Sequence, residues 1–285
     1  MVVATCITEV CAEHGEGPIW DAVRNVLVIV DMERGALVEV TPEGATTRHE
    51  LGGVAAAIRP RVAGGYVLAV ARGFQLLTAD FTPDGPVTTA FADEGLRMND
   101  GGCDPQGRFY CGSMAYDEAA GAGTLYRFDP DRSVHPVVGD LTIPNGLQWT
   151  ADGRTVLHVD TPTDRIDAHD FDPGTGTFSN RRPFVSIPEG AGHPDGMAID
   201  EEDGVWVALW GGSAVHHYTA DGALADVIEV NAKDVTACAF GGGDRSTLYI
   251  TTSRRDRGDA DGPQAGAVFA VPTRVRGAVP FPFAG

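Results

Sequence analysis

The chain has 285 residues, 43% of them hydrophobic, which is enough for a sizeable core in one large or two ordinary domains. Its formal net charge of −19 disfavours nucleic acid and anionic membranes as partners, because both require clustered Lys and Arg. No apolar run approaches the ~18 residues of a membrane span, and no basic start precedes an apolar stretch at the N-terminus. We therefore expect a cytoplasmic protein without a signal peptide.

The five cysteines lack CxxC spacing, which favours reduced thiols over disulfides or a cysteine zinc site.

Short apolar segments bounded by Gly, Pro, Asp or Asn occur along the whole chain and predict β-strands. In chain order they are Val26–Val30, Ala36–Val40, Tyr66–Val70, Arg108–Cys111, Leu125–Phe128, Val156–Val159, Val205–Leu209 and Leu248–Thr251. Turn sequences such as Pro83-Asp-Gly and Asp152-Gly separate them. No segment shows an amphipathic pattern of three helical turns, so we expect an all-β fold.

One fragment type recurs along the chain: a polar residue, glycine, a short strand, an acidic turn and a second strand. It begins at Asn99, Asn145 and Asp195, with spacings of 46 and 50 residues. Similar steps reach Thr236 in one direction and Ile58 and Glu16 in the other. The sequence thus contains six units, starting near residues 16, 57, 99, 145, 195 and 236.

Six such units predict a six-bladed β-propeller with four-stranded antiparallel blades, formed by residues 1–285 as a single domain. Because a propeller closes on itself, we expect a strand within Val2–Val10 to complete the last blade beside Ala267–Val271.

The innermost strands of a propeller line its channel, so equivalent residues at their starts converge on the axis. Here these residues are Glu16, Asn99, Asn145 and Asp195. Each of them alone also fits an ordinary turn or a solvated loop. Together, two carboxylates and two amide oxygens predict a site on the central axis for one divalent metal ion such as Ca²⁺, Mg²⁺ or Mn²⁺.

Several motifs resemble the family of senescence marker protein, regucalcin, gluconolactonase and luciferin-regenerating enzyme, whose members are six-bladed propellers. The stretches that carry the resemblance are His14-Gly-Glu-Gly-Pro-Ile-Trp, Arg97-Met-Asn-Asp-Gly, Ile143-Pro-Asn-Gly-Leu-Gln-Trp, Asp167-Ala-His-Asp-Phe-Asp, Pro194-Asp-Gly-Met-Ala-Ile-Asp and Cys238-Ala-Phe-Gly-Gly. The resemblance implies that Glu16, Asn145 and Asp195 coordinate the metal, while Arg97 and Asn99 contact substrate. It also implies a lactonase of sugar acids, acting in carbohydrate metabolism on a small-molecule lactone.

The chemistry of such a site follows from general principles. A divalent ion polarises a lactone carbonyl and stabilises the developing oxyanion, while Asp195 at the edge of the metal shell accepts a proton from water. Oxygen ligands favour calcium, although Mg²⁺, Mn²⁺ and Zn²⁺ remain open. Arg97 would hold sugar hydroxyls or a developing carboxylate; its alternative is a surface ion pair with Glu94. We therefore predict a metal-dependent carboxylic ester hydrolase, as a monomer or weak homo-oligomer.

Some assignments stay open at the level of sequence. His14 and His193 each lie two residues before a predicted ligand, and either borders the site or only the channel. Asp117 is a further candidate substrate contact, and Arg59 is the one charge of the second unit that could point inward. The polar, Gly-rich loop 254–263 is a lid or a connector.

Two other functions compete with the lactonase. One is a calcium-dependent phosphotriesterase of the diisopropyl fluorophosphatase type, which Asn99 as a fourth ligand would favour. The other is a noncatalytic metal-binding propeller. The sequence lacks the nucleophile elbow of serine hydrolases, the His-Glu-x-x-His motif and the phosphate-binding and dinucleotide-binding glycine motifs, so those enzyme classes are excluded.

Overall fold

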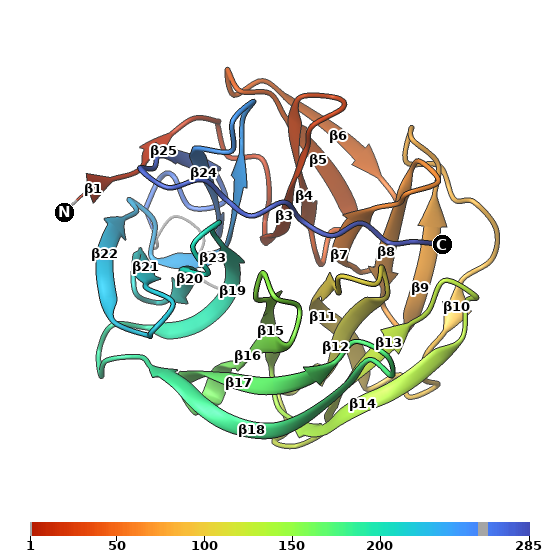
Figure 1. The fold of residues 1–285 in the computed structure, drawn as a ribbon. Coiled ribbons are helices and arrows are strands. Elements are labelled where there is room, and N and C mark those ends of the chain that lie inside the picture. The colour runs from red at the N-terminus through yellow and green to blue at the C-terminus, as the bar shows by residue number, and fades with distance from the viewer. Residues whose placement is uncertain (1, 256–261) are drawn as a thin grey trace.

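Six β-sheets are arranged radially around a central axis in the computed structural model, which describes residues 2–255 and 262–285 (Figure 1). Apart from the added N-terminal strands, neighbouring strands within each sheet follow one another along the chain and are antiparallel, so the predicted all-β six-bladed propeller is confirmed. In the described residues the only helix is the 3₁₀ turn η1 (Thr161–Thr163), and no helix is long and apolar enough to cross a membrane. Residues 256–261 of the predicted loop 254–263 lie outside the described residues.

The first three blades contain four strands each. Their bounds are β3 (Gly15–Asp21), β4 (Val26–Asp31), β5 (Ala36–Val40) and β6 (Thr46–Glu50); β7 (Ala55–Pro60), β8 (Tyr66–Val70), β9 (Gly73–Leu77) and β10 (Thr88–Thr89); and β11 (Leu96–Cys103), β12 (Phe109–Ala115), β13 (Gly123–Phe128) and β14 (Val134–Leu141).

The last three blades follow the same order, and the N-terminal residues add strands to two of them. Their bounds are β15 (Pro144–Trp149), β16 (Thr155–Asp160), β17 (Arg165–Asp172) and β18 (Thr177–Ser186); β19 (His193–Ile199), β20 (Val205–Trp210), β21 (Ala214–Tyr218), β22 (Leu224–Glu229) and β1 (Val2–Val3); and β23 (Asp234–Gly241), β24 (Thr247–Ser253), β25 (Phe269–Pro272) and β2 (Thr5–Cys6).

The hydrophobic core lies between the blades. In the first blade, β4 and β5 are almost wholly buried on both faces, because each face packs against a neighbouring sheet. The outer strand β6, with the sequence Thr-Thr-Arg-His-Glu, is mostly exposed. The inner strands contact one another all around the ring, including β23 with β3, so the ring is closed.

The N-terminal residues pair with two blades, the last one beside Ala267–Val271 and its neighbour. Only Thr5–Cys6 pair beside β25, through Thr5 with Ala270 and Cys6 with Phe269. Val2–Val3 instead pair in parallel with Ile228–Glu229, so the blade that contains β19 gains a fifth strand. One short segment therefore joins two adjacent blades, because its first residues reach past the last blade to the outer edge of its neighbour.

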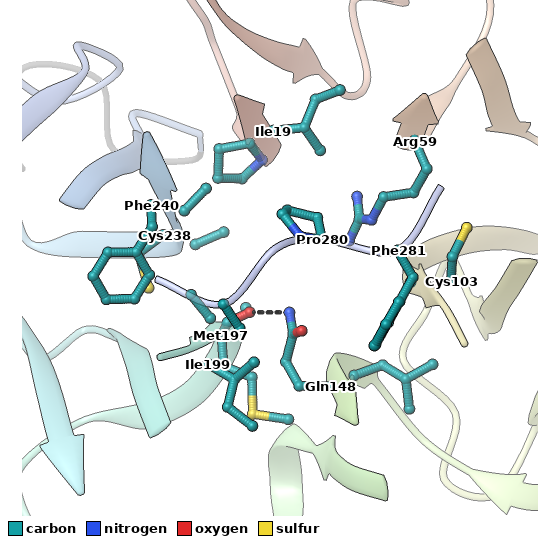
Figure 2. A pocket seen from close by; sticks show the side chains of 18 of the residues that line it. Ile19, Arg59, Cys103, Gln148, Met197, Ile199, Cys238, Phe240, Pro280 and Phe281 are labelled. Carbon is teal, nitrogen blue, oxygen red and sulfur yellow. Dashed lines mark hydrogen bonds between the residues drawn. The ribbon is translucent and has the colours of Figure 1, made fainter. Parts of the chain in front are cut away.

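The C-terminal segment, residues 277–285, crosses the face of the ring that holds the ends of the inner strands (Figures 1 and 2). It pairs at Gly277 with Asp200 and at Phe283 with Arg61. The Phe283 ring is fully buried and stacks on Phe128, with centroids 5.1 Å apart. Under this segment lies a cavity of about 110 Å³. Arg59 does point inward, but into this cavity, where it donates hydrogen bonds to backbone carbonyls.

Each of the six inner strands contains a β-bulge at an equivalent position. In β11 the pairing shifts between Met98 and Gly101, and in β19 it shifts between Pro194 and Met197. An extra residue at a bulge bends the strand and redirects side chains. Residues on the two sides of these bulges line different cavities, the small one described above and a larger one at the starts of the inner strands.

Candidate functional site

The larger cavity has a volume of about 430 Å³ and lies where the inner strands begin. Its lining includes the four residues that the sequence analysis assigned to the axis, Glu16, Asn99, Asn145 and Asp195, together with the predicted substrate contact Arg97. They come from four strands, β3, β11, β15 and β19, and lie in or beside the bulges. The Asn-Gly and Asp-Gly sequences thus belong to bulged strands rather than to the turns that each motif alone would suggest.

Glycine follows three of these residues, Glu16, Asn145 and Asp195, and after the last two it is required because the inner strands approach closely. A Cβ atom on Gly146 would lie 2.8 Å from the carbonyl oxygen of Asp195, and one on Gly196 would lie 2.5 Å from the Cβ of Ala237. Both contacts are too short for a side chain, so only glycine allows adjacent inner strands to bring their polar residues to the same cavity.

Glu16 and Asp195 are the two buried carboxylates of the cavity, each about 5% exposed. Burial, together with the charge of Asp100, raises the pKa of Glu16 to about 8. Burial and the nearby Glu16 raise the pKa of Asp195 well above its usual value. The Oδ1 atom of Asp195 is buried and has no hydrogen-bond partner within residues 2–255 and 262–285. A divalent cation would favour the ionised forms of both carboxylates, so burial of this kind suits a cation-binding site.

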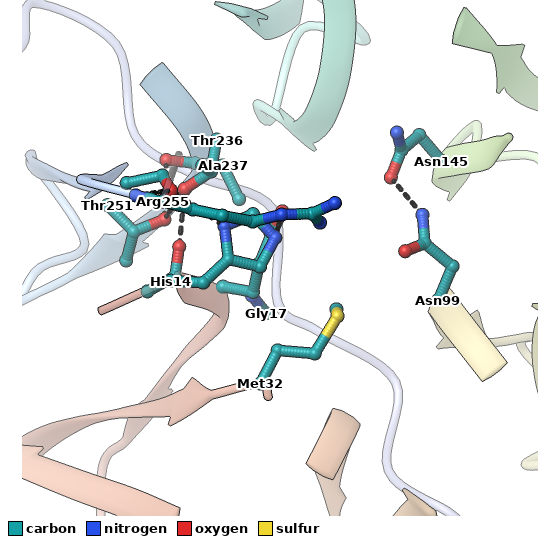
Figure 3. A network of polar contacts seen from close by, with 12 residues as sticks. His14, Gly17, Met32, Asn99, Asn145, Thr236, Ala237, Thr251 and Arg255 are labelled. Atoms are coloured by element: carbon teal, nitrogen blue, oxygen red, sulfur yellow. Dashed lines mark hydrogen bonds and ion pairs between the residues drawn. The ribbon is translucent and has the colours of Figure 1, made fainter. Parts of the chain in front are cut away.

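A hydrogen-bond chain orients the two amides. Asn99 donates from Nδ2 to the Oδ1 of Asn145 and to the carbonyl of Pro144, both at 3.0 Å. Asn145 donates from Nδ2 to the hydroxyl of Thr161 at 2.8 Å, and Thr161 donates to the carbonyl of Pro194. Figure 3 shows the Asn99–Asn145 pair on the opposite side of the cavity from His14.

Arg97 is 3% exposed, and its Nη1 atom donates to three acceptors: the Asn99 Oδ1 at 2.7 Å, the Met98 carbonyl and the Met32 sulfur. Burial lowers its pKa. The alternative of a surface ion pair with Glu94 is wrong, because Glu94 pairs instead with Arg72 at 2.8 Å. Since the Asn99 oxygen accepts from Arg97, it faces the guanidinium rather than the carboxylates.

Both candidate histidines line the cavity. His14 is buried, its Nδ1 lies 2.9 Å from the Ser253 hydroxyl, and its Nε2 lies 3.8 Å from a Glu16 oxygen. Burial and two nearby guanidinium groups lower its pKa to about 3, so its ring is neutral at pH 7. His193 is exposed at the rim, where its Nδ1 lies 2.6 Å from an oxygen of Asp164.

Asp117 does not line the cavity. It is exposed and accepts a hydrogen bond from the amide of Ala119. Glu118 lines the cavity in its place, because the chain turns there through a left-handed residue with φ of 58°. Trp210 and Arg255 also line it and were not predicted. Trp210 follows the apolar run of β20 and reads as a core residue, while Arg255 lies in a polar loop without a repeat partner.

The donor set fits a hard divalent cation. Glu16, Asn145 and Asp195 offer carboxylate and amide oxygens, which Ca²⁺ prefers, and one buried oxygen of Asp195 lacks a partner in the described part of the chain. Within that same part, no three His, Cys, Asp or Glu side chains are grouped for a metal. A cation here would therefore need the amide oxygen of Asn145 beside the two carboxylates.

This fold and site define a class: a six-bladed propeller with hard oxygen donors gathered at the axial bulges of its inner strands. Comparison with known proteins gives the family. The chain belongs to the SMP-30/gluconolactonase/LRE-like family, whose model matches residues 14–254.

Relatives with known names cover almost the whole chain. Pentonolactonase XacC from Haloferax volcanii is 34% identical over 284 residues, covering 97% of this chain and 96% of its own. Regucalcin from Xenopus laevis is 33% identical over 300 residues, covering 98% of both chains. The crystal structure of a calcium-binding regucalcin from Agrobacterium tumefaciens superposes with a TM-score of 0.90 at 28% identity, over 100% of this chain and 98% of the other.

Proposed function

We propose that this protein is a metal-dependent lactonase that opens the ring of a sugar-acid lactone. The observation that carries the proposal is the meeting of two buried carboxylates, Glu16 and Asp195, with the amide of Asn145 in one cavity, where an Asp195 oxygen has no partner in the described residues. Glu16, Asn145 and Asp195 would hold one divalent ion, with calcium favoured by the oxygen donors. The ion, when bound, would polarise the ester carbonyl and stabilise charge that develops on its oxygen.

The side chains of the cavity would supply the remaining steps. Asp195 accepts a proton from the water whose oxygen adds to the ester carbon. The bond from that carbon to the ring oxygen then breaks, the ring oxygen takes up the proton as a hydroxyl, and the product is a hydroxy acid. Arg97 and Asn99 bind and orient substrate oxygens, and Arg97 is held for this role by its hydrogen bonds through Nη1.

The geometry offers no support for the phosphotriesterase alternative. Asn99 as a fourth metal ligand would favour that alternative, whereas its oxygen accepts from Arg97 and its nitrogen donates toward Asn145. Glu118 replaces Asp117 as the candidate substrate contact on the β12–β13 connection. The cytoplasmic location and the monomer or weak homo-oligomer remain predictions.

The test is proton release at neutral pH from a panel of pentono- and hexonolactones, with chelated protein before and after addition of Ca²⁺, Mg²⁺, Mn²⁺ or Zn²⁺. A phosphotriester serves as the competing substrate, and the exposed-site variant Asp226→Asn as the matched control. We expect metal-dependent ring opening that Asp195→Asn abolishes and Asp226→Asn retains. Metal-dependent phosphotriester hydrolysis, or metal binding without turnover of any substrate, would support the corresponding alternative.

A further inference from the structure

Arg97 carries a buried positive charge without a carboxylate close enough to neutralise it. Its guanidinium is within 4.0 Å of no Asp or Glu oxygen in residues 2–255 and 262–285, and the three acceptors of its Nη1 are uncharged. Its Nε and Nη2 atoms donate to no acceptor in the described part of the chain, which leaves them for a ligand. Burial of a charge is unfavourable unless an opposite charge accompanies it.

A second guanidinium lines the same cavity. Arg255, just after β24, lies beside His14 in Figure 3 and extends over the cavity toward the asparagine pair. Its Nη1 is 3.0 Å from an oxygen of Glu33, and its backbone amide donates to the Ser253 hydroxyl. Glu33 follows Met32, whose sulfur accepts from Arg97, so the same turn of the first blade supports both arginines.

The two guanidinium groups lie close enough to the His14 ring for the charge of each to change its pKa. Both lower the pKa of the His14 ring that lies beside them, and the charge of Arg255 also lowers the pKa of Arg97. The two carboxylates of the cavity, Glu16 and Asp195, are assigned above to a divalent ion and would be neutralised by it. Glu33 pairs with Arg255 and also raises the pKa of Arg97, but it forms no ion pair with Arg97 in the described residues, so the charge of Arg97 remains without a direct counter-charge.

We propose that Arg97 and Arg255 form an anion subsite and that the preferred substrate is a lactone with a second acidic group, a carboxylate or a phosphate, away from the ester. This inference rests on the proposed function and names its substrate class. The planar donors of arginine match the oxygens of either group and can bind them in pairs. A hydroxyl in the same place would accept hydrogen bonds but would leave the charge of Arg97 without a counter-charge.

The substrate test compares three lactones on metal-loaded protein: neutral D-glucono-1,5-lactone, its 6-phosphate, and D-glucaro-1,4-lactone with a carboxylate. We expect at least a tenfold higher kcat/KM for one of the anionic lactones than for the neutral one, and the better of the two identifies the acidic group. Arg255→Gln should reduce this preference about tenfold, mainly through KM, because it removes a charged donor. An equal kcat/KM for all three lactones, or an unchanged preference in Arg255→Gln, would overturn the subsite.

Arg254→Gln is the matched control, since it removes the same charge one residue earlier from a side chain that does not line the cavity. It should keep the preference of the wild type. If Arg254→Gln reduces the preference as much as Arg255→Gln does, the effect is one of general charge and the subsite is wrong.

A binding measurement separates this inference from the lactonase proposal. Calorimetry would compare D-gluconate, with one carboxylate, and D-glucarate, with two, neither of which needs to react. Tighter binding of glucarate that Arg255→Gln removes supports the subsite even if no lactone is opened, in which case only the proposed function fails. Equal binding of the two acids, with lactones still opened, leaves the lactonase intact and rejects the subsite.

Discussion

At the scale of single residues, the two buried carboxylates of the site destabilise the metal-free protein. Glu16 and Asp195 are buried in one cavity, burial raises the pKa of both, and the charge of Glu16 raises the pKa of Asp195 further. Neither has an ion pair with Lys or Arg in the described ranges; the nearest basic group to Glu16 is the His14 ring at 3.8 Å. Such an arrangement is unfavourable without a cation, which is expected of a binding site and not of a structural ion pair.

The first prediction concerns Asp195→Asn. We expect kcat/KM to fall by roughly 10²–10⁴, because the variant removes a proton acceptor and weakens the metal site. The melting temperature of the metal-free variant should rise by ~2–4 °C if relief of the repulsion contributes about 1 kcal/mol. The gain in melting temperature that the wild type shows on adding Ca²⁺ should be absent. A thermal scan with and without chelator measures both, and a metal-dependent gain equal to that of the wild type would contradict the assignment.

Residues on the axis could be predicted where the repeat fixed their position. Glu16, Asn99, Asn145 and Asp195 share one phase of the six units, and all four line the cavity. Cavity-lining residues in the loops that connect the strands could not be predicted in this way. One left-handed residue decides that Glu118 rather than Asp117 lines the cavity, and a difference of one position in a loop has no signature in composition or periodicity.

At the scale of strands, the bulges are what turn six similar inner strands into a site. They recur in every blade, including blades whose bulge residues, such as Ala56 and Thr236, offer no carboxylate. The bulge is thus a property of the fold, and the chemistry depends on which residues occupy it. No pattern in the sequence distinguishes a bulge from a turn, which is why the Asp-Gly and Asn-Gly motifs allowed both readings.

The second prediction tests the close approach of inner strands. Gly196→Ala should destabilise the protein by about 1–3 kcal/mol, because its Cβ would overlap Ala237 on the neighbouring inner strand. Gly139→Ala in β14 is the matched control, since a Cβ there meets no atom within 4 Å. Urea unfolding measures the difference, and equal stability of the two variants would show that the inner strands separate easily.

The third prediction concerns two buried histidines on adjacent strands, His158 of β16 and His169 of β17. Their Nε2 atoms have no hydrogen-bond partner among residues that the structure describes, and the ring centroids are 6.1 Å apart. Burial is the main cause that lowers the pKa of His158 to about 3 and that of His169 to about 4. The nearby charges are Arg181, Arg182, Asp167 and Asp170.

Because the folded pKa lies below the unfolded one, the folded protein binds fewer protons, and stability is complete above pH ~6.5 and lost as the pH falls. For His158 the loss should be on the order of 1–2 kcal/mol by pH 5. His158→Leu should therefore show a weaker decline of unfolding free energy between pH 7 and 5 than the wild type. The exposed His135→Leu should decline as the wild type does, and an equal decline in all three proteins would exclude this role for His158.

At the scale of the whole molecule, both ends of the chain hold the ring together. The N-terminal residues pair with β25 and β22, and the C-terminal segment connects strand ends on several blades across the axis. The ring and its blades were predictable because turns and strands alternate regularly. The crossing segment was not, because it is rich in proline and follows the last repeat, so it carries no strand signal and no repeat phase.

The fourth prediction tests this segment. Phe283→Ala should destabilise the protein by ~3–5 kcal/mol, because it empties a fully buried position among aromatic rings. Val279→Ala, in the same segment but 64% exposed, should change stability by less than ~0.5 kcal/mol. If both variants unfold at the same denaturant concentration as the wild type, the C-terminal segment does not stabilise the ring.

The central claim is that one divalent ion, held by Glu16, Asn145 and Asp195, is required for lactone hydrolysis. The measurement that tests it most directly is the rate of proton release from a single lactone as metal is titrated into chelated protein. We predict no rate above background without metal and a linear rise that ends at one equivalent. A chelated protein that already hydrolyses the lactone at the final rate would contradict the claim.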